Sequence, residues 1–173
     1  MTRGAPTIRR ARPDDADAIG SVHVRSWRSS YRGVIPDEFL DALDPGARAE
    51  TWRARLAKPE VDTFVAERGG EVVGFACGGR AQTQGEPEEG EVYSIYLLDE
   101  AKGQGVGRAL FLEVCRRLAE RGSTRLVVWV LEDNARARRF YQSLGGAPAA
   151  QKRACIGGRE LTELRYDWSA IPH

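Results

Sequence analysis

The spacing of apolar residues changes several times along the chain, and each change predicts a new element of secondary structure. Near the amino terminus the segment PTIRRARPDD predicts a short strand. Ile19, Val22 and Trp27 then recur at helical spacing, after two aspartates that can cap a helix. A second helix is predicted to follow Pro45, with Trp52 on its apolar face.

The middle of the chain alternates between strand and helix patterns. DTFVAERGGEVVGFACGGR predicts a hairpin that turns at Gly69–Gly70, and the acidic segment QTQGEPEEG predicts a loop. EVYSIYLL predicts the next strand, and a helix is predicted from about residue 105 to about residue 121, burying Phe111 and Val114 among others. The uninterrupted run TRLVVWVL is typical of a central strand that is buried on both faces.

The carboxyl-terminal part predicts one more helix and a last pair of strands. NARARRFYQSLG predicts a short helix that Asn134 caps and Gly145 ends, and KRACIGGRELTELRYDW predicts a hairpin around Gly157–Gly158. Helices and strands alternate in the middle of the chain, with hairpins on both sides, so the pattern predicts an α/β fold with a mixed sheet. No repeat or linker divides the sequence, and we expect a single domain over residues 1–173.

The composition is that of one soluble domain. Of 173 residues 42% are hydrophobic, and the formal net charge of +1 favours neither nucleic acid nor a membrane as a partner. Cys77, Cys115 and Cys155 form no C-x-x-C pair, which indicates free thiols in a reducing compartment. The chain has no apolar signal segment and no run long enough to span a bilayer, so we expect a cytoplasmic protein. The two histidines lead us to expect no metal site.

Three glycines, Gly103, Gly105 and Gly107, stand where a helix is predicted to begin, although glycine costs a helix roughly 1 kcal/mol relative to alanine. The first N–H groups of a helix lack backbone partners and carry partial positive charge, so missing side chains would let an anion approach them. The glycines suit a tight turn equally well. Arg108 after Gly107 does not fit a P-loop, and the spacing lacks the last glycine of a dinucleotide motif.

Two segments resemble the signatures of the GNAT superfamily of N-acetyltransferases. Lys102–Gly107 resembles the acetyl-CoA-binding pattern Q/R-x-x-G-x-G/A, and NARARRFYQSLG resembles N-x-x-A-x-x-F/Y-Y-x-x-L-G. Lys102, Asp99 and Gly146 depart from the usual Gln or Arg, proline and aromatic residue. The resemblance covers nearly all of the chain and implies a single GNAT-like α/β domain. Its sheet would be mixed, mostly antiparallel and splayed at the centre, with about seven strands, and would be flanked by four helices.

The resemblance also implies that acetyl-CoA is the co-substrate. The glycine backbone would hold the pyrophosphate, and free N–H groups of the preceding strand would hold the pantetheine arm and the acetyl carbonyl. The residues assigned to acetyl-CoA in this way are Ile95, Leu97, Lys102, Gly103, Gln104, Gly105, Val106, Gly107, Arg108 and Asn134.

Tyr141 lies where the family places the general acid that protonates the departing thiolate. A phenol suits this function, because its ordinary pKa is about 10 and that of a thiol about 8.5. The alternative is packing on the apolar face of the helix. Phe140 and Tyr141 are adjacent, and a helix is not expected to turn both inward, so one of the two is expected to have another function.

Glu91 matches the general-base glutamate of the histone-acetylating members of the family. Simple alternation places Glu91, Tyr93, Ile95 and Leu97 on one strand face, with Glu91 about 13 Å from Ile95. A water molecule would therefore have to relay the proton from an amine that attacks near Ile95. The alternative is a solvated charge at the strand end, next to the acidic loop.

The acceptor is expected to bind near Trp27, Tyr31 and Glu91, because aromatic and acidic side chains suit a cationic amine. For Trp27 the alternative is packing in the core. The predicted function is acetyl transfer from acetyl-CoA to a primary amine of a small molecule or peptide, by direct attack in a ternary complex. The alternative is a non-catalytic acyl-CoA-binding or sensing domain. A longer acyl group and a homodimer both remain open.

Overall fold

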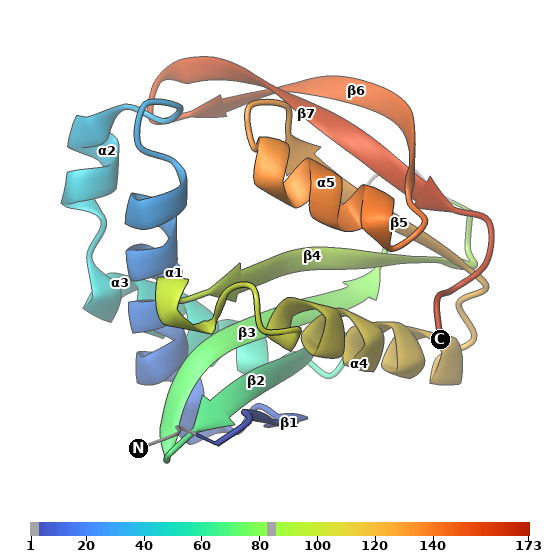
Figure 1. The fold of residues 1–173 in the computed structure, drawn as a ribbon, viewed down its shortest axis with the longest axis horizontal. Coiled ribbons are helices and arrows are strands. Elements are labelled where there is room, and N and C mark those ends of the chain that lie inside the picture. Colours follow the sequence, from blue (N-terminus) through green and yellow to red (C-terminus); the bar gives the residue numbers. More distant parts are fainter. Residues whose placement is uncertain (1–3, 83–85) are drawn as a thin grey trace.

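The computed structural model describes residues 4–82 and 86–173, and its centre is a seven-stranded sheet in the order β1-β2-β3-β4-β5-β7-β6 (Figure 1). Neighbouring strands are antiparallel except β4 and β5, which are parallel. The strands are β1 (Thr7–Arg10), β2 (Asp62–Arg68), β3 (Glu71–Arg80), β4 (Glu89–Leu97), β5 (Arg125–Leu131), β6 (Ala147–Ile156) and β7 (Arg159–Trp168). This arrangement confirms the predicted mixed, mostly antiparallel sheet. Residues 83–85 of the predicted acidic loop lie outside the described residues.

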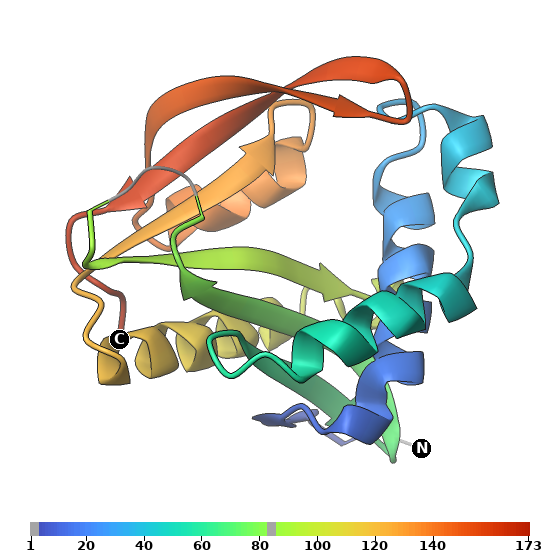
Figure 2. The same ribbon diagram turned by 180° about the vertical axis from the view of Figure 1, so that it is seen from behind.

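Helices cover both faces of the sheet. α4 packs on one face of β2, β3 and β4, and α1 packs on the other face together with α3 (Figures 1 and 2). The described α-helices are α1 (Ala16–Ser30), α2 (Asp37–Ala42), α3 (Pro45–Leu56), α4 (Val106–Glu120) and α5 (Ala135–Ser143). Four helices were expected. The additional one, α2, is a single short segment after Pro36, too short for an apolar period to be visible in the sequence.

The centre of the sheet is splayed, as predicted. β4 pairs with β5 only through Glu89–Arg125, Gly90–Leu126 and Glu91–Val127. On its other side β4 stays paired with β3 as far as Leu97. The edge of β4 that faces β5 beyond Glu91 is therefore not paired with β5, and the two strands diverge (Figures 1 and 2).

Local sequence signals predicted both ends of α5 correctly. The Asn134 side chain accepts a hydrogen bond from the Ala137 N–H at 3.0 Å, and Gly145 ends α5 with a φ of 91°. Asp15 stands at the N-cap position of α1, as predicted, but its side chain makes no capping hydrogen bond to that helix. The Asp15 carboxylate instead accepts from the Arg12 N–H at 2.6 Å and pairs with Arg9 at 2.7 Å.

One buried carboxylate ties β1, β2 and α4 together. Asp62 is fully buried at the start of β2. Its oxygens accept from Arg10 of β1 at 2.9 Å, from Arg117 of α4 at 3.2 Å and from Arg121, which follows α4, at 2.5 Å. Asp62 thus anchors the carboxyl-terminal end of α4 to the sheet.

Candidate active site

The predicted cradle lies where β4 leads into α4. Gly103 and Gly105 have φ of 74° and 78°, a conformation that favours glycine, and Gly105 is the residue that precedes α4. A Cβ built at either position would have no described atom within 4 Å. The two glycines therefore make the turn and also leave the first N–H groups of α4 uncovered, so the two interpretations of the sequence are compatible.

Side chains around the cradle are tied away from the helix start. Lys102 pairs with Asp99 at 2.5 Å and lies 3.3 Å from the Ser30 hydroxyl. The Gln104 amide donates to the Glu100 carbonyl at 2.7 Å and accepts from Arg68 at 2.6 Å. Arg108 is exposed on the first turn of α4, and the Val106 side chain is buried. What this segment can offer an anion is chiefly backbone N–H groups.

Gly107 stands between the end of β4 and α5. A Cβ at this position would lie 3.4 Å from Leu97 and 3.5 Å from Phe140, which is ordinary contact, and its φ is not positive. A side chain here would fill the space between these two residues without disturbing the backbone. Gly107 is therefore a position where a side chain would face both Leu97 and Phe140.

Three tyrosines gather at the open end of the splay. Tyr31, the residue after α1, belongs to a cluster with Leu131 of β5 and packs near Tyr96 of β4. Burial raises the pKa of Tyr31, and the side chains of Asn134 and Tyr96 act in the opposite direction. Burial likewise raises the pKa of Tyr96, to which the nearby Tyr31 and Tyr141 hydroxyls add. Tyr31 was predicted to bind the acceptor and Asn134 to bind acetyl-CoA. The structure places the two side chains next to each other.

Tyr141 is buried among aromatic rings. Its ring centroid lies 6.3 Å from Phe111, 6.4 Å from Tyr166 and 6.2 Å from Trp168. Burial raises the pKa of Tyr141, and the nearby Tyr31 contributes in the same direction, so the phenol keeps its proton at neutral pH. Its hydroxyl makes no hydrogen bond to the described residues that the structure records. It is therefore free to donate to a bound group.

The expectation that Phe140 and Tyr141 cannot both turn inward was wrong. Phe140 also contacts the core, with its centroid 6.3 Å from Phe111 and 5.2 Å from Tyr141. α5 meets Phe111 of α4 on one side and Trp168 of β7 on another, so two of its sides contact apolar groups. Crowding on the helix therefore gives no argument for catalysis, and any function of Tyr141 depends on its hydroxyl.

A β-bulge changes which residues of β4 share a face. Glu91 lies opposite Gly79 and Val92 opposite Gly78, but Ser94 lies opposite Cys77, so Tyr93 is an extra residue. The insertion shifts the alternation by one position. The expectation that Glu91, Tyr93, Ile95 and Leu97 share one face was therefore wrong.

Glu91 lies on the face that α1 and α3 cover, together with Ser94 and Tyr96. The Ser94 hydroxyl lies 3.1 Å from Cys77 Sγ, and the Tyr96 ring packs 5.6 Å from Phe75, which itself contacts α3. Ile95 and Leu97 lie on the α4 face. The N–H groups of β4 are directed along the sheet, so a group lying between β4 and β5 can be reached from both faces.

Glu91 is 7% exposed, which excludes the alternative of a solvated charge. Burial raises the pKa of its carboxyl, and a hydrogen bond of 2.8 Å from the Gln82 N–H partly opposes that shift. Lys152, Glu163 and Arg165 from β6 and β7 lie close enough to influence the same carboxyl. A raised pKa is what a carboxylate needs in order to accept a proton near neutral pH.

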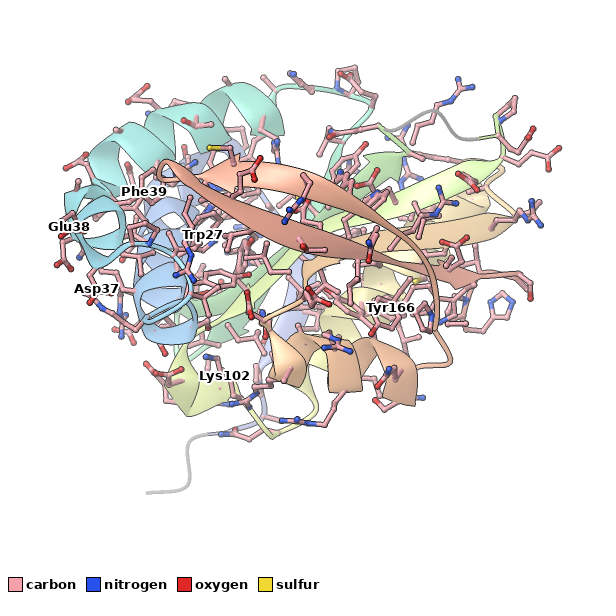
Figure 3. All side chains as sticks on the ribbon, turned by 90° about the horizontal axis from the view of Figure 1, so that it is seen from above. Trp27, Asp37, Glu38, Phe39, Lys102 and Tyr166 are labelled. Atoms are coloured by element: carbon pink, nitrogen blue, oxygen red, sulfur yellow. The ribbon has the colours of Figure 1, made fainter. Side chains whose placement is uncertain are left out.

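The other predicted acceptor residue, Trp27, is half-buried in an aromatic cluster. Its ring lies 5.3 Å from His23, 5.2 Å from Tyr31 and 6.2 Å from Tyr96. Figure 3 shows it on α1, on the same side as Phe39 of α2. Trp27 thus both packs in the cluster and borders Tyr31 at the open end.

His23 and Trp52 belong to the core beneath this cluster. The Trp52 indole N–H donates to His23 Nδ1 at 3.0 Å, so the neutral imidazole carries its proton on Nε2. Burial, with Arg48 and Arg55 nearby, lowers the pKa of His23 to about 3. His23 is therefore neutral at physiological pH.

The tip of the last hairpin rests on the segment that follows α1. The Arg159 guanidinium donates to the Val34 carbonyl at 2.9 Å, and Gly157 lies against Phe39. The hairpin therefore extends from β5 to α2 (Figure 2). It lies along the side of the sheet that carries Glu91, which is called the acceptor side below.

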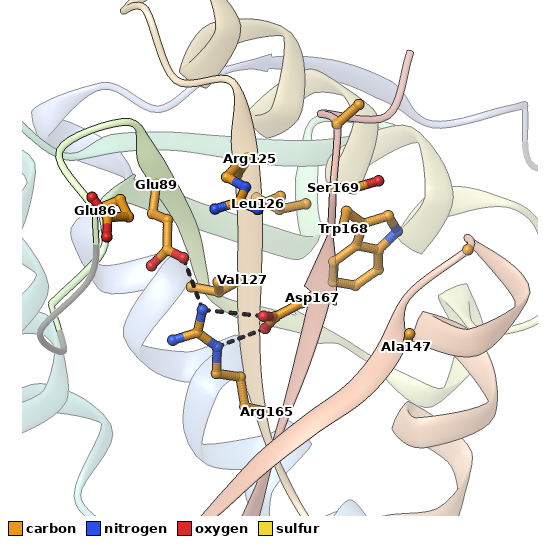
Figure 4. Close-up of a pocket in the computed structure, with 12 residues that line it drawn as sticks. Glu86, Glu89, Arg125, Leu126, Val127, Ala147, Arg165, Asp167, Trp168 and Ser169 are labelled. Atoms are coloured by element: carbon orange, nitrogen blue, oxygen red, sulfur yellow. Dashed lines mark hydrogen bonds and ion pairs between the residues drawn. The ribbon is translucent and has the colours of Figure 1, made fainter.

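A cavity of about 870 Å³ lies at the other end of β4, where β4 and β5 are paired. Figure 4 shows Arg165 in its wall, bonded to Glu89 at 2.9 Å and to Asp167 at 2.6 Å. Glu89 starts β4 and the cradle follows Leu97, so about 26 Å of strand separates the two sites. This cavity is distinct from the cradle. It shares the acceptor side of the sheet with Glu91.

Two further features concern the described residues as a whole. No three His, Cys, Asp or Glu side chains among them come together in a way that could hold a metal ion. In residues 4–82 and 86–173, no helix combines the length and the apolar character needed to cross a bilayer.

Comparison with known proteins agrees with this geometry. The model of the Acetyltransferase (GNAT) family matches residues 22–146. The chain is 36% identical over 163 residues to the uncharacterized N-acetyltransferase YuaI of Bacillus subtilis, covering 94% of this chain and 92% of that protein. The fold is similar to that of PaiA N-acetyltransferase from Thermoplasma acidophilum in complex with coenzyme A, with a TM-score of 0.75, 17% identity and coverage of 95% and 100% of the two chains. It is also similar to that of yncA from Salmonella typhimurium with acetyl-CoA, with a TM-score of 0.74, 24% identity and coverage of 98% and 96%. The chain therefore belongs to the GNAT family of acetyltransferases.

Proposed function

We propose that the protein transfers the acetyl group of acetyl-CoA to a primary amine of a small molecule or peptide, by direct attack in a ternary complex. The observation that carries this proposal is the free edge of β4 beyond Glu91, which leads directly to the uncovered N-terminus of α4. An extended group can pair with that edge while its phosphates meet the helix start.

The open space in front of Gly103 and Gly105 fits a pyrophosphate. In the proposal the backbone from Lys102 to Arg108 holds it, helped by the positive end of the helix. N–H groups of Ile95 and Leu97 bind the pantetheine arm and the acetyl carbonyl, on which negative charge develops during attack. The Asn134 amide oxygen already caps α5, and its N–H₂ group, one N–H of which faces Tyr31, has a second N–H for the arm.

The proposed proton transfers use Glu91 and Tyr141. Glu91, acting through a water molecule, accepts the proton that the amine nitrogen loses as it attacks the carbonyl carbon. The C–N bond forms, the C–S bond breaks, and Tyr141 donates its proton to the departing sulfur. The buried, polar surroundings of Glu91 and the protonated state of Tyr141 support this division.

Acetyl-CoA is expected to stabilise the fold by about 2.7 kcal/mol at a hundredfold excess over its dissociation constant. NAD at the same concentration should stabilise far less, because it lacks the pantetheine arm. Thermal melts check the binding, and CoA release with a panel of amines checks the reaction. Stabilisation by NAD instead of acetyl-CoA contradicts the assignment of the cradle. Tight acetyl-CoA binding without CoA release for any amine supports a non-catalytic domain.

Gly107→Val is expected to weaken acetyl-CoA binding at least tenfold, whereas Gly107→Ala should bind normally, because the pattern Q/R-x-x-G-x-G/A accepts alanine at this position. A Cβ at this position makes only ordinary contacts with Leu97 and Phe140. The two γ-methyl groups of valine extend further and would occupy space that the bound cofactor is proposed to use. Calorimetric titration measures the affinity, and chemical denaturation measures the stability.

Gly46→Val is the matched control, because Gly46 is also the second residue of its helix, α3. A Cβ there meets only the Asp44 side chain, at 3.1 Å. Its acetyl-CoA affinity should equal that of the wild type. Equal affinities of the two variants would mean that Gly107 serves the fold alone.

A further inference from the structure

A lysine of the chain itself lies against an aromatic ring on the acceptor side of the sheet. The Lys152 ammonium of β6 is 4.1 Å from the centroid of the Trp129 ring of β5, and 3.4 Å from Glu163 of β7. An aromatic face and a carboxylate are the two groups that bind an ammonium ion most directly. The three strands thus form a cation position that Lys152 occupies.

This position lies next to the splay. Trp129 pairs with Arg165 and Leu131 with Glu163, so Trp129 and Glu163 lie beyond Val127, the last residue of β5 that pairs with β4. Glu91 lies opposite Val127, and alternate residues of a strand share a face, so Trp129 is on the same side of the sheet as Glu91.

Electrostatic coupling agrees with this placement. Lys152 lowers and Glu163 raises the pKa of Glu91, and Glu163 also raises the pKa of Tyr31. The cation position therefore lies between two groups. One is Glu91, the proposed base, and the other is Tyr31, which lies where β4 and β5 are furthest apart.

Lys152 is held loosely, in contrast to its neighbour Arg165. The Lys152 side chain is 39% exposed and contacts one carboxylate, whereas Arg165 is 16% exposed and bonds to both Glu89 and Asp167. A half-exposed ion pair contributes little to stability, and a lysine side chain has many rotamers. Another ammonium ion can therefore replace that of Lys152, while Arg165 stays in place.

The position also has an unused hydrogen-bond donor. The Trp129 indole N–H is buried and has no partner among the described residues. A buried donor without a partner is costly, and an ammonium group cannot accept a hydrogen bond, so a water molecule beside the bound amine would satisfy this N–H.

We propose that Trp129 and Glu163 form the specificity subsite for the acceptor, and that the acceptor is an alkyl diamine whose second, protonated amine displaces Lys152. The proposal rests on the proposed function. One amine reaches the thioester as the neutral nucleophile, and the other keeps its proton, since an alkylamine has a pKa of about 10. Two carboxylates, Glu91 and Glu163, then face two amine groups.

The test compares 1,4-diaminobutane with butylamine and with 4-amino-1-butanol, which have the same chain and lack the second cation. We expect kcat/KM for the diamine to exceed that for either monoamine at least tenfold, because a charge-assisted hydrogen bond and a cation–π contact are added. Diamines of three to six carbons would then show which spacing fits.

Two variants locate the effect. Glu163→Gln should lower the ratio of kcat/KM for diamine over butylamine about tenfold. Lys152→Met should lower KM for the diamine about fivefold, since no internal cation competes. Lys58→Met, which removes a lysine between α3 and β2, is the control and should leave all values unchanged.

The outcomes separate the two proposals. Acetylation of butylamine without preference for the diamine overturns the subsite and leaves the proposed function intact. So does a preference for anionic amines that Lys152→Met abolishes, which would make Lys152 the specificity residue. Calorimetric titration of 1,4-diaminobutane into CoA-saturated protein is independent of turnover. Absence of diamine binding there overturns the subsite, whatever the activity assays give.

Discussion

Tyr141→Phe is expected to lower the single-turnover rate of acetyl transfer by about 10²- to 10⁴-fold, the usual contribution of a general acid. Phenylalanine keeps the ring contacts with Phe111 and Trp168 and removes only the hydroxyl. Because that hydroxyl has no recorded hydrogen bond to the described residues, the fold loses little with it. Acetyl-CoA affinity should stay nearly constant, and a rapid-quench experiment follows the chemical step without product release.

Tyr166→Phe is the matched control for this change. Its ring belongs to the same aromatic group, 6.4 Å from Tyr141, but its hydroxyl lies 3.4 Å from Arg138 and from Gln142 of α5. Its rate should stay close to that of the wild type. If Tyr141→Phe also reacted within a factor of about three of the wild type, Tyr141 would have no part in proton transfer.

Asp62→Ala is expected to lower the free energy of unfolding by about 3 kcal/mol, because it removes a buried carboxylate with charge-assisted hydrogen bonds. Asp62 is fully buried and bonds to Arg10, Arg117 and Arg121. The arginines are partly exposed and can be hydrated again, which keeps the loss below that of a stranded buried charge. Urea denaturation measures the change.

Asp41→Ala provides the comparison for this prediction. Asp41 also pairs with an arginine, Arg32, but it is exposed, and such pairs contribute little. Its stability should be close to that of the wild type. A similar loss in both variants would show that burial of Asp62 is not what gives the interaction its strength.

The parts of the fold that could be predicted are those that neighbouring residues decide. Gly103 and Gly105 mark a turn into a helix, and the Asn134 cap and the Gly145 end are local signals of the same kind. The apolar run of β5 predicted a central strand for similar reasons. These elements gave the cradle and the α/β class without knowledge of strand pairing.

The rest depends on pairing between distant segments. The extra residue Tyr93 cannot be recognised from alternation alone, because it is defined by the register of β4 against β3. That single insertion moved Glu91 to the opposite face from Ile95. Lys152 and Glu163 come to the acceptor side only through the order β5-β7-β6, which reverses the last two strands.

The three residue pairs that join β4 to β5 have a mechanical consequence. They divide the sheet into two half-sheets, β1 to β4 and β5 to β6, that share a short seam. α4, which carries the cradle, packs on the first half-sheet, while Trp129, Lys152 and Glu163 belong to the second. A molecule that pairs with the free edge of β4 extends this seam, so its binding energy also joins the halves.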